Sequence, residues 1–171
     1  MSRRFLLKRE LELKLVKRFP TIFQDYGGDM RKTCMAWGFS HGDGWYDLLE
    51  EACLEIEKLC KDNGIRVVAL QVKEKFGSLR FYYTVEYDTE KTDELGEVTK
   101  KIDEVISNAE EKSYTTCEIC GKPGKTTGQF WIKTLCEECD KEKNDPPKGE
   151  FKDTAEMMFG KEDEVKDNTG P

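Results

Sequence analysis

Two Cys-x-x-Cys pairs constrain this chain more than any other feature of its sequence. Cys117 and Cys120 form the first pair, and Cys136 and Cys139 form the second after fifteen intervening residues. Each pair makes a tight turn that directs two thiolates at one point, and four thiolates complete the tetrahedral shell that zinc prefers. The spacing therefore predicts one structural Zn²⁺ ion per chain. A shell closed by protein ligands leaves no position for water or substrate, so we expect this metal to stabilise the fold and to perform no chemistry.

Composition divides the chain into three parts. Of the 171 residues, 37% are charged and 37% hydrophobic, and the formal net charge is −7. We expect an α+β core over residues 1–113, a zinc ribbon over 114–140 that packs on it, and an acidic, flexible tail over 141–171 with six Lys and Arg against nine Asp and Glu. Neither a signal-peptide h-region nor an apolar run of 18 residues is present, so we expect a cytoplasmic protein without a membrane partner.

Apolar periodicity predicts the elements of the core. The fold class that it indicates is α+β, with a β-hairpin or small antiparallel sheet packed on helices. The expected helices span residues 4–19, 45–63 and 93–112, the hairpin strands span 65–75 and 79–87, and a further short strand spans 32–39. Asp43 or Gly44 is the expected N-cap of the second helix. Alternation predicts that Val68, Leu70, Val72 and Phe76 face the core together with Leu79, Phe81, Tyr83 and Val85.

Two places in the sequence are candidates for ligand binding. The first is the loop of His41, Asp43 and Trp45, whose two interspersed glycines permit unusual backbone conformations beside a helix N-terminus, where anions are attracted. Its alternative role is a helix cap with Trp45 as a core anchor. The second is the polar hairpin face, which could bind phosphates through its cations and stack a base on its aromatic ring, or could be a solvated surface. That face carries Lys73, Lys75, Arg80 and Tyr82.

Enzyme templates are nearly absent from the sequence. A single histidine excludes His-rich catalytic metal sites, and no Ser-His-Asp combination has a local signature. A nucleophilic pair of Cys34 and His41 is conceivable, but nothing in the sequence orients the histidine. Cys53 and Cys60 lie on the apolar stripe of the second helix and are expected to be small buried hydrophobes. We therefore predict no catalytic residue.

Three motifs together resemble a group of small uncharacterised proteins that phages and prophages encode. They are the loop Gly42-Asp43-Gly44-Trp45, the run from Gln71 to Tyr82, and the Cys-x-x-Cys-Gly pair followed by the second Cys-x-x-Cys pair. The resemblance covers roughly residues 30 to 140. It implies a phage accessory protein that acts in the bacterial cytoplasm.

The leading hypothesis is therefore a non-enzymatic protein that binds and blocks or sequesters a host-defence component. That component would be a host protein or a nucleotide-type signal, and a homo-oligomer is possible. The alternative is a nucleic-acid-binding zinc ribbon, which the negative net charge disfavours. An enzyme of unknown class is the third hypothesis.

Overall fold

The chain forms an α+β fold, as the sequence predicts. A computed structural model describes residues 6–87, 95–128 and 131–144. Within these residues lie four α-helices and two separate antiparallel sheets of two strands each. The helices are α1 (Arg9–Arg18), α2 (Tyr46–Asn63), α3 (Leu95–Ser113) and α4 (Glu137–Asn144), with short 3₁₀ turns η2 (Cys34–Trp37) and η3 (Asp43–Trp45). The strands are β1 (Ile65–Lys75), β2 (Ser78–Tyr87), β3 (Lys125–Thr127) and β4 (Lys133–Leu135).

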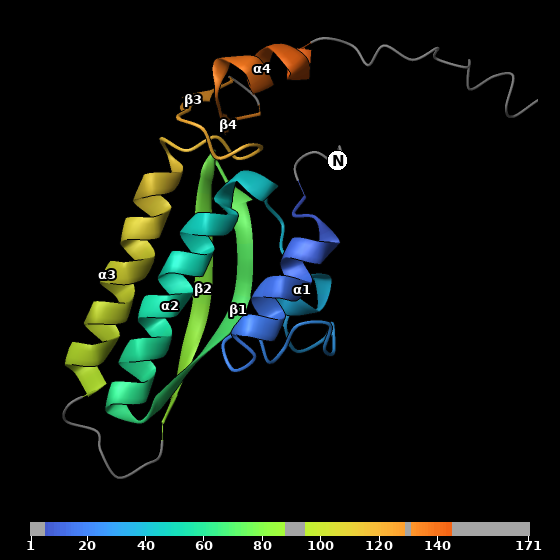
Figure 1. The fold of residues 1–171 in the computed structure, drawn as a ribbon. Coiled ribbons are helices and arrows are strands. Elements are labelled where there is room, and N and C mark those ends of the chain that lie inside the picture. The colour runs from blue at the N-terminus through green and yellow to red at the C-terminus, as the bar shows by residue number, and fades with distance from the viewer. Residues whose placement is uncertain (1–5, 88–94, 129–130, 145–171) are drawn as a thin grey trace, which may run out of the picture.

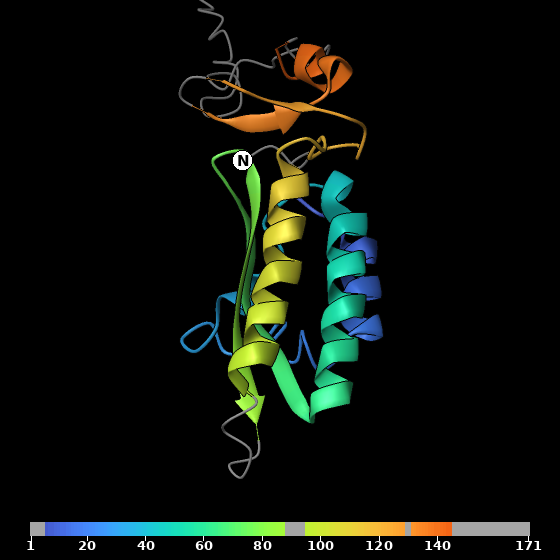
Figure 2. The same ribbon diagram turned by 90° about the vertical axis from the view of Figure 1, so that its left-hand side faces the viewer.

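Two layers make up the core. Helices α2 and α3 lie side by side over one face of the β1–β2 hairpin, and α1 lies beyond the β1 edge (Figure 1). The second view separates the hairpin layer from the helix layer and places β3, β4 and α4 beyond the hairpin turn (Figure 2). The ribbon (residues 114–140) therefore covers one end of the core. None of the described helices combines the length and the apolar composition that a membrane span requires.

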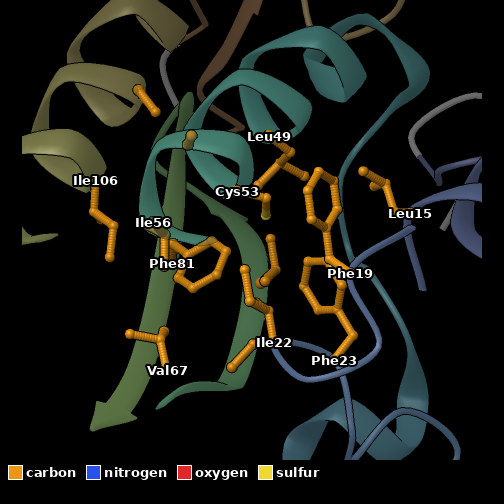
Figure 3. Packing of buried hydrophobic residues seen from close by; sticks show 14 of the residues in the cluster. Leu15, Phe19, Ile22, Phe23, Leu49, Cys53, Ile56, Val67, Phe81 and Ile106 are labelled. Atoms are coloured by element: carbon orange, nitrogen blue, oxygen red, sulfur yellow. The ribbon is translucent and has the colours of Figure 1, made fainter. Parts of the chain in front are cut away.

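The predicted apolar stripe of α2 forms the centre of the main hydrophobic core. Leu49, Cys53 and Ile56 of this helix are completely buried. Figure 3 shows Phe19 and Phe23 packed beside Leu49 and Cys53 of the helix. The helix ends at Asn63, as predicted, because Gly64 adopts a left-handed conformation with φ of 65° that stops the helix. The expected N-cap is wrong, because Trp45 occupies that position and no side chain caps the helix.

A bulge in β1 corrects the predicted faces of the hairpin. The strand register passes from Ala69 opposite Tyr83 to Gln71 opposite Tyr82, so Leu70 has no partner. Because one extra residue reverses the alternation, Val67 and Ala69 face the core before the bulge and Val72 faces it afterwards. The expectation that Val68 and Leu70 share a face with Val72 is therefore wrong, although Val68 is itself buried, on the opposite face. Val72 and the predicted residues of β2 do lie on the core face.

The hairpin turn departs from the prediction as well. Phe76 and Gly77 are its two central residues, and both have positive φ, at 54° and 79°. Positive φ at both positions is the requirement of a type I′ turn, which matches the twist of the strands. The side chain of Phe76 points to solvent with 66% of its surface exposed, so the expectation that it joins the core is wrong.

The N-terminal third is less regular than the sequence suggests. The predicted strand over residues 32–39 is wrong, because η2 occupies its centre and only Ser40 pairs with β1, by a parallel bridge to Lys73. Helix α1 begins at Arg9. The predicted helix begins at residue 4, which lies outside the described residues. Of the predicted tail over 141–171, residues 141–144 belong to α4, and residues 145–171 also lie outside the described residues.

Candidate metal centre

Four cysteine side chains converge at the end of the core. The sulfur atoms of Cys117, Cys120, Cys136 and Cys139 all lie within 4.8 Å of one another, and those of Cys120 and Cys136 are 3.6 Å apart. Sulfurs bound to one tetrahedral zinc ion, at about 2.3 Å each, are separated by about 3.8 Å. The cluster could therefore hold one metal ion, and it is the only such cluster among the residues that the structure describes.

Backbone hydrogen bonds shape both cysteine pairs. The N–H of Gly121 donates to the carbonyl of Cys117 at 2.9 Å, and the N–H of Cys117 donates to the carbonyl of Lys122 at 2.8 Å. The second pair spans the start of α4, where unpaired N–H groups favour a thiolate. A hydrogen bond from the backbone of Cys139 is the main reason that the pKa of Cys136 is lowered to about 7. Burial raises the pKa of Cys139, so Cys136 is the more easily ionised thiol of the second pair.

The glycine-flanked loop packs its backbone directly against the first cysteine pair. A Cβ atom at Gly44 would lie 2.1 Å from the carbonyl oxygen of Cys117, and one at Gly42 would lie 2.4 Å from that of Glu118. The N–H of Gly44 donates to the Glu118 carbonyl at 2.8 Å. Trp45, which is fully buried, donates its indole N–H to the carbonyl of Thr116 at 2.8 Å. Both glycines are needed for this close approach.

The hairpin turn forms a second contact with the ribbon. Thr134 of β4 donates its hydroxyl to the carbonyl of Gly77 at 2.6 Å. A Cβ atom at Gly77 would lie 3.0 Å from a methyl carbon of Thr126 and 3.1 Å from one of Ile132. The turn of the core hairpin therefore lies on the small β3–β4 sheet.

A buried ion cluster lies between these two contacts. The ammonium of Lys133, which is fully buried, lies 2.8 Å from the carboxylate of Glu74 and 2.9 Å from that of Glu118. Burial raises the pKa of Glu118 to about 7, and the positive charge of Lys133 opposes that rise. Glu74 also accepts a hydrogen bond from the N–H of Gly77 at 2.7 Å. The cluster joins β4, the first cysteine pair and the hairpin turn through charge.

The loop residues predicted to bind a ligand lie together at this junction. His41 is fully buried, its Nδ1 donates to the carbonyl of Gly42 at 2.9 Å, and burial lowers its pKa to about 4, so the ring is neutral at pH 7. Asp43 is partly buried and accepts from the backbone N–H of Lys8 at 2.8 Å. Trp45 anchors the ribbon as described. These three side chains contact the protein itself, and a role in ligand binding stays a prediction.

The hairpin residues form a separate group, in which Lys75 and Tyr82 are exposed and Lys73 and Arg80 are partly buried. The Lys73 ammonium lies 5.5 Å from the centre of the Tyr82 ring, and the Lys75 ammonium lies 5.5 Å from that of Phe76. Arg80 is less available, because it forms a 3.3 Å ion pair with Glu110. The structure thus brings three of the four predicted residues to one accessible surface, and their binding role also stays a prediction.

Sequence reasoning missed the residues that join the ribbon to the core. Glu74, Glu118 and Lys133 are separated widely along the chain and look like ordinary surface charges. The glycines of the loop were the one available signal, although close packing was not the role expected of them.

No protein-family model matches the chain, and neither a curated protein nor a solved structure matches it.

Proposed function

We propose that the chain is a non-enzymatic binding protein with one structural zinc ion. The observation that carries this proposal is the cluster of four cysteines, against whose first pair the loop of residues 41–45 packs its backbone, while the hairpin turn packs on the adjoining β3–β4 sheet. A tetrahedral set of four thiolates suits zinc and leaves no coordination position for catalysis. Because the metal binds where the ribbon contacts the core, metal binding supplies folding free energy to both the ribbon and the core.

The outer hairpin face is the surface that we propose for binding. Lys73 and Lys75 form no ion pair with any carboxylate in the part of the chain that the structure describes, and each lies over an aromatic ring. Cations that no internal acid neutralises are available to an anionic partner. The resemblance to phage-encoded proteins supports a host-defence component as that partner, either a protein or a nucleotide signal.

Native mass spectrometry of the protein from bacterial cells tests the metal and the ligand together. We expect the mass of the polypeptide plus one zinc ion. An additional mass of nucleotide size would identify a sequestered signal, and a protein without zinc would refute the metal assignment.

Affinity purification from bacterial lysate tests the binding face. We expect the double variant Lys73→Glu/Lys75→Glu to lose proteins that the wild type retains. The matched control is Lys100→Glu/Lys101→Glu, which makes the same charge change on exposed positions of α3. Equal retention by both double variants would remove the hairpin face from the proposal.

The alternative of nucleic-acid binding by the ribbon has weaker support. Lys133 is fully buried, and Lys122 forms a 2.6 Å ion pair with Glu138. Among the ribbon's lysines that the structure describes, this leaves Lys125 for phosphate contact. An affinity for oligonucleotides that falls steeply with salt would favour this alternative, because phosphate binding releases counterions.

A further inference from the structure

Phe76 occupies a backbone conformation that aromatic residues rarely adopt. Its φ of 54° lies in the left-handed region, where the Cβ atom of an L-residue is crowded. The first central position of a type I′ turn is usually filled by Asn, Asp or Gly for this reason. A phenylalanine at this position therefore strains the turn without helping it to form.

Packing does not explain the residue either. The Phe76 side chain is 66% exposed, and the ring contact that the structure records for it is the ammonium of Lys75. A residue that strains the backbone and exposes an apolar ring is a local conflict of the kind that marks functional positions.

The turn that carries Phe76 is nevertheless well anchored. The N–H of Gly77 donates to Glu74 at 2.7 Å, and the carbonyl of Gly77 accepts the Thr134 hydroxyl at 2.6 Å. The hydroxyl of Ser78 donates to the carbonyl of Lys75 at 3.1 Å. Because both sides of the turn are fixed, the exposed ring is presented without a large loss of conformational entropy on binding.

Two lysine side chains belong to the strand that leads into the Phe76 turn. Lys75 adjoins Phe76. Lys73 lies two residues before Lys75 in β1, and its ammonium lies over the ring of Tyr82, which is 42% exposed. An aromatic anchor with cations beside it has the composition of an interaction hot spot.

We infer that Phe76 is the apolar anchor of an interaction surface for an acidic protein segment. The partner would offer a hydrophobic pocket to the ring and carboxylates to Lys73 and Lys75. This inference rests on the proposed binding function and names its anchor and its partner chemistry. A short acidic segment brings only a few carboxylates, whereas a nucleic acid carries a negative charge at every phosphate, so the net charge of −7 opposes a nucleic acid more strongly than an acidic segment.

Peptide display on the zinc-loaded full-length chain tests the inference. Random twelve-residue peptides are selected on the wild type, and the most enriched sequence is synthesised for fluorescence-polarisation titration. We expect enriched peptides to be acidic and to contain an aromatic or large aliphatic residue. Phe76→Asn should weaken binding of the synthetic peptide at least tenfold while the thermal midpoint stays equal or rises, since Asn suits the turn. Lys73→Glu/Lys75→Glu should weaken it similarly, and Lys100→Glu/Lys101→Glu should not.

The outcomes separate this inference from the proposed function. If Phe76→Asn binds like the wild type but Lys73→Glu/Lys75→Glu does not, the anchor is refuted and the binding face survives. If both bind normally, both are refuted. A clear fall in the thermal midpoint of Phe76→Asn would show that the ring is structural. Enriched peptides without acidic bias, or tighter binding of a twenty-residue oligothymidylate than of the peptide, would refute the acidic protein partner.

Discussion

Replacement of Gly44 by alanine tests whether the backbone of its loop packs directly against the backbone of the first cysteine pair. An added Cβ would lie 2.1 Å from the Cys117 carbonyl oxygen, 2.4 Å from the Gly121 nitrogen and 2.8 Å from the Cys120 nitrogen. All three neighbours are backbone atoms of the turn that provides two metal ligands. The φ of Gly44 lies outside the left-handed region, so the penalty comes from contact and not from backbone preference.

The expected cost follows from what must move. The two backbones have to separate by about 1 Å to restore ordinary contact distances, and overpacking of this kind costs about 1–3 kcal/mol. Separation also breaks the 2.8 Å hydrogen bond from Gly44 to the Glu118 carbonyl, which contributes about 1 kcal/mol. We therefore expect a loss of about 2–4 kcal/mol in the free energy of unfolding. For a chain of this size each 1 kcal/mol lowers the thermal midpoint by about 2–4 °C.

Thermal unfolding with zinc present, followed by circular dichroism, measures this loss, and a colorimetric chelator measures the rate of zinc release. The matched control is Gly96→Ala in the first turn of α3, where an added Cβ meets nothing within 4 Å. Alanine favours a helix over glycine by up to about 1 kcal/mol, so the control should be unchanged or stabilised. If Gly44→Ala melts with the control and releases zinc at the wild-type rate, the two backbones are not packed as described.

Further predictions concern the metal, the buried charges and the free thiols. Chelation of the metal should lower the thermal midpoint of the whole chain, not only that of the ribbon, and calorimetry before and after chelation measures it. Lys133→Met should lose about 3–5 kcal/mol in urea unfolding because it strands the carboxylate of Glu118, and Lys133→Met/Glu118→Leu should recover part of that loss. The pKa of His41 is lowered to about 4, so the stability that its neutral ring supplies is complete above pH 6.5. Between pH 6.5 and pH 4 this stability falls by about 1 kcal/mol for each pH unit. The difference in urea midpoint between wild type and His41→Phe should shrink over the same range. A thiol reagent should modify exposed Cys34 rapidly and spare Cys53, whose burial raises its pKa, and peptide mass mapping reads both sites.

Local patterns were sufficient to predict most of the elements. The stripe of α2 and its stop at Gly64 depend on neighbours within a few turns, so the sequence contains the whole signal. The faces of β1 were not predictable in the same way, because one unpaired residue at Leu70 reverses the alternation. Nothing in an alternating run of apolar residues indicates where such a bulge occurs.

The residues of the candidate site also differ in whether the sequence could predict them. Spacing alone predicted that the four cysteines meet, because the ligands of structural zinc sites typically occur in Cys-x-x-Cys pairs. The ion cluster of Glu74, Glu118 and Lys133 was not predictable, since its members come together only after the ribbon has packed on the core. A lysine between two cysteine pairs is indistinguishable in sequence from a solvated one.

The residues of the loop and of the hairpin turn fall into two groups with different physical roles. Gly42, Gly44 and Trp45 are accounted for by packing, since their contacts with the ribbon require their size and their hydrogen bonds. Lys75 and Phe76 make no comparable contribution to packing, and the conformation of Phe76 opposes folding. These two residues therefore add little to stability, and under the proposed function they contact a partner. The β3–β4 sheet beside the cysteine cluster contacts the hairpin turn at Gly77. Under the proposed function, a metal held by the four cysteines therefore supports a binding surface that it does not contact.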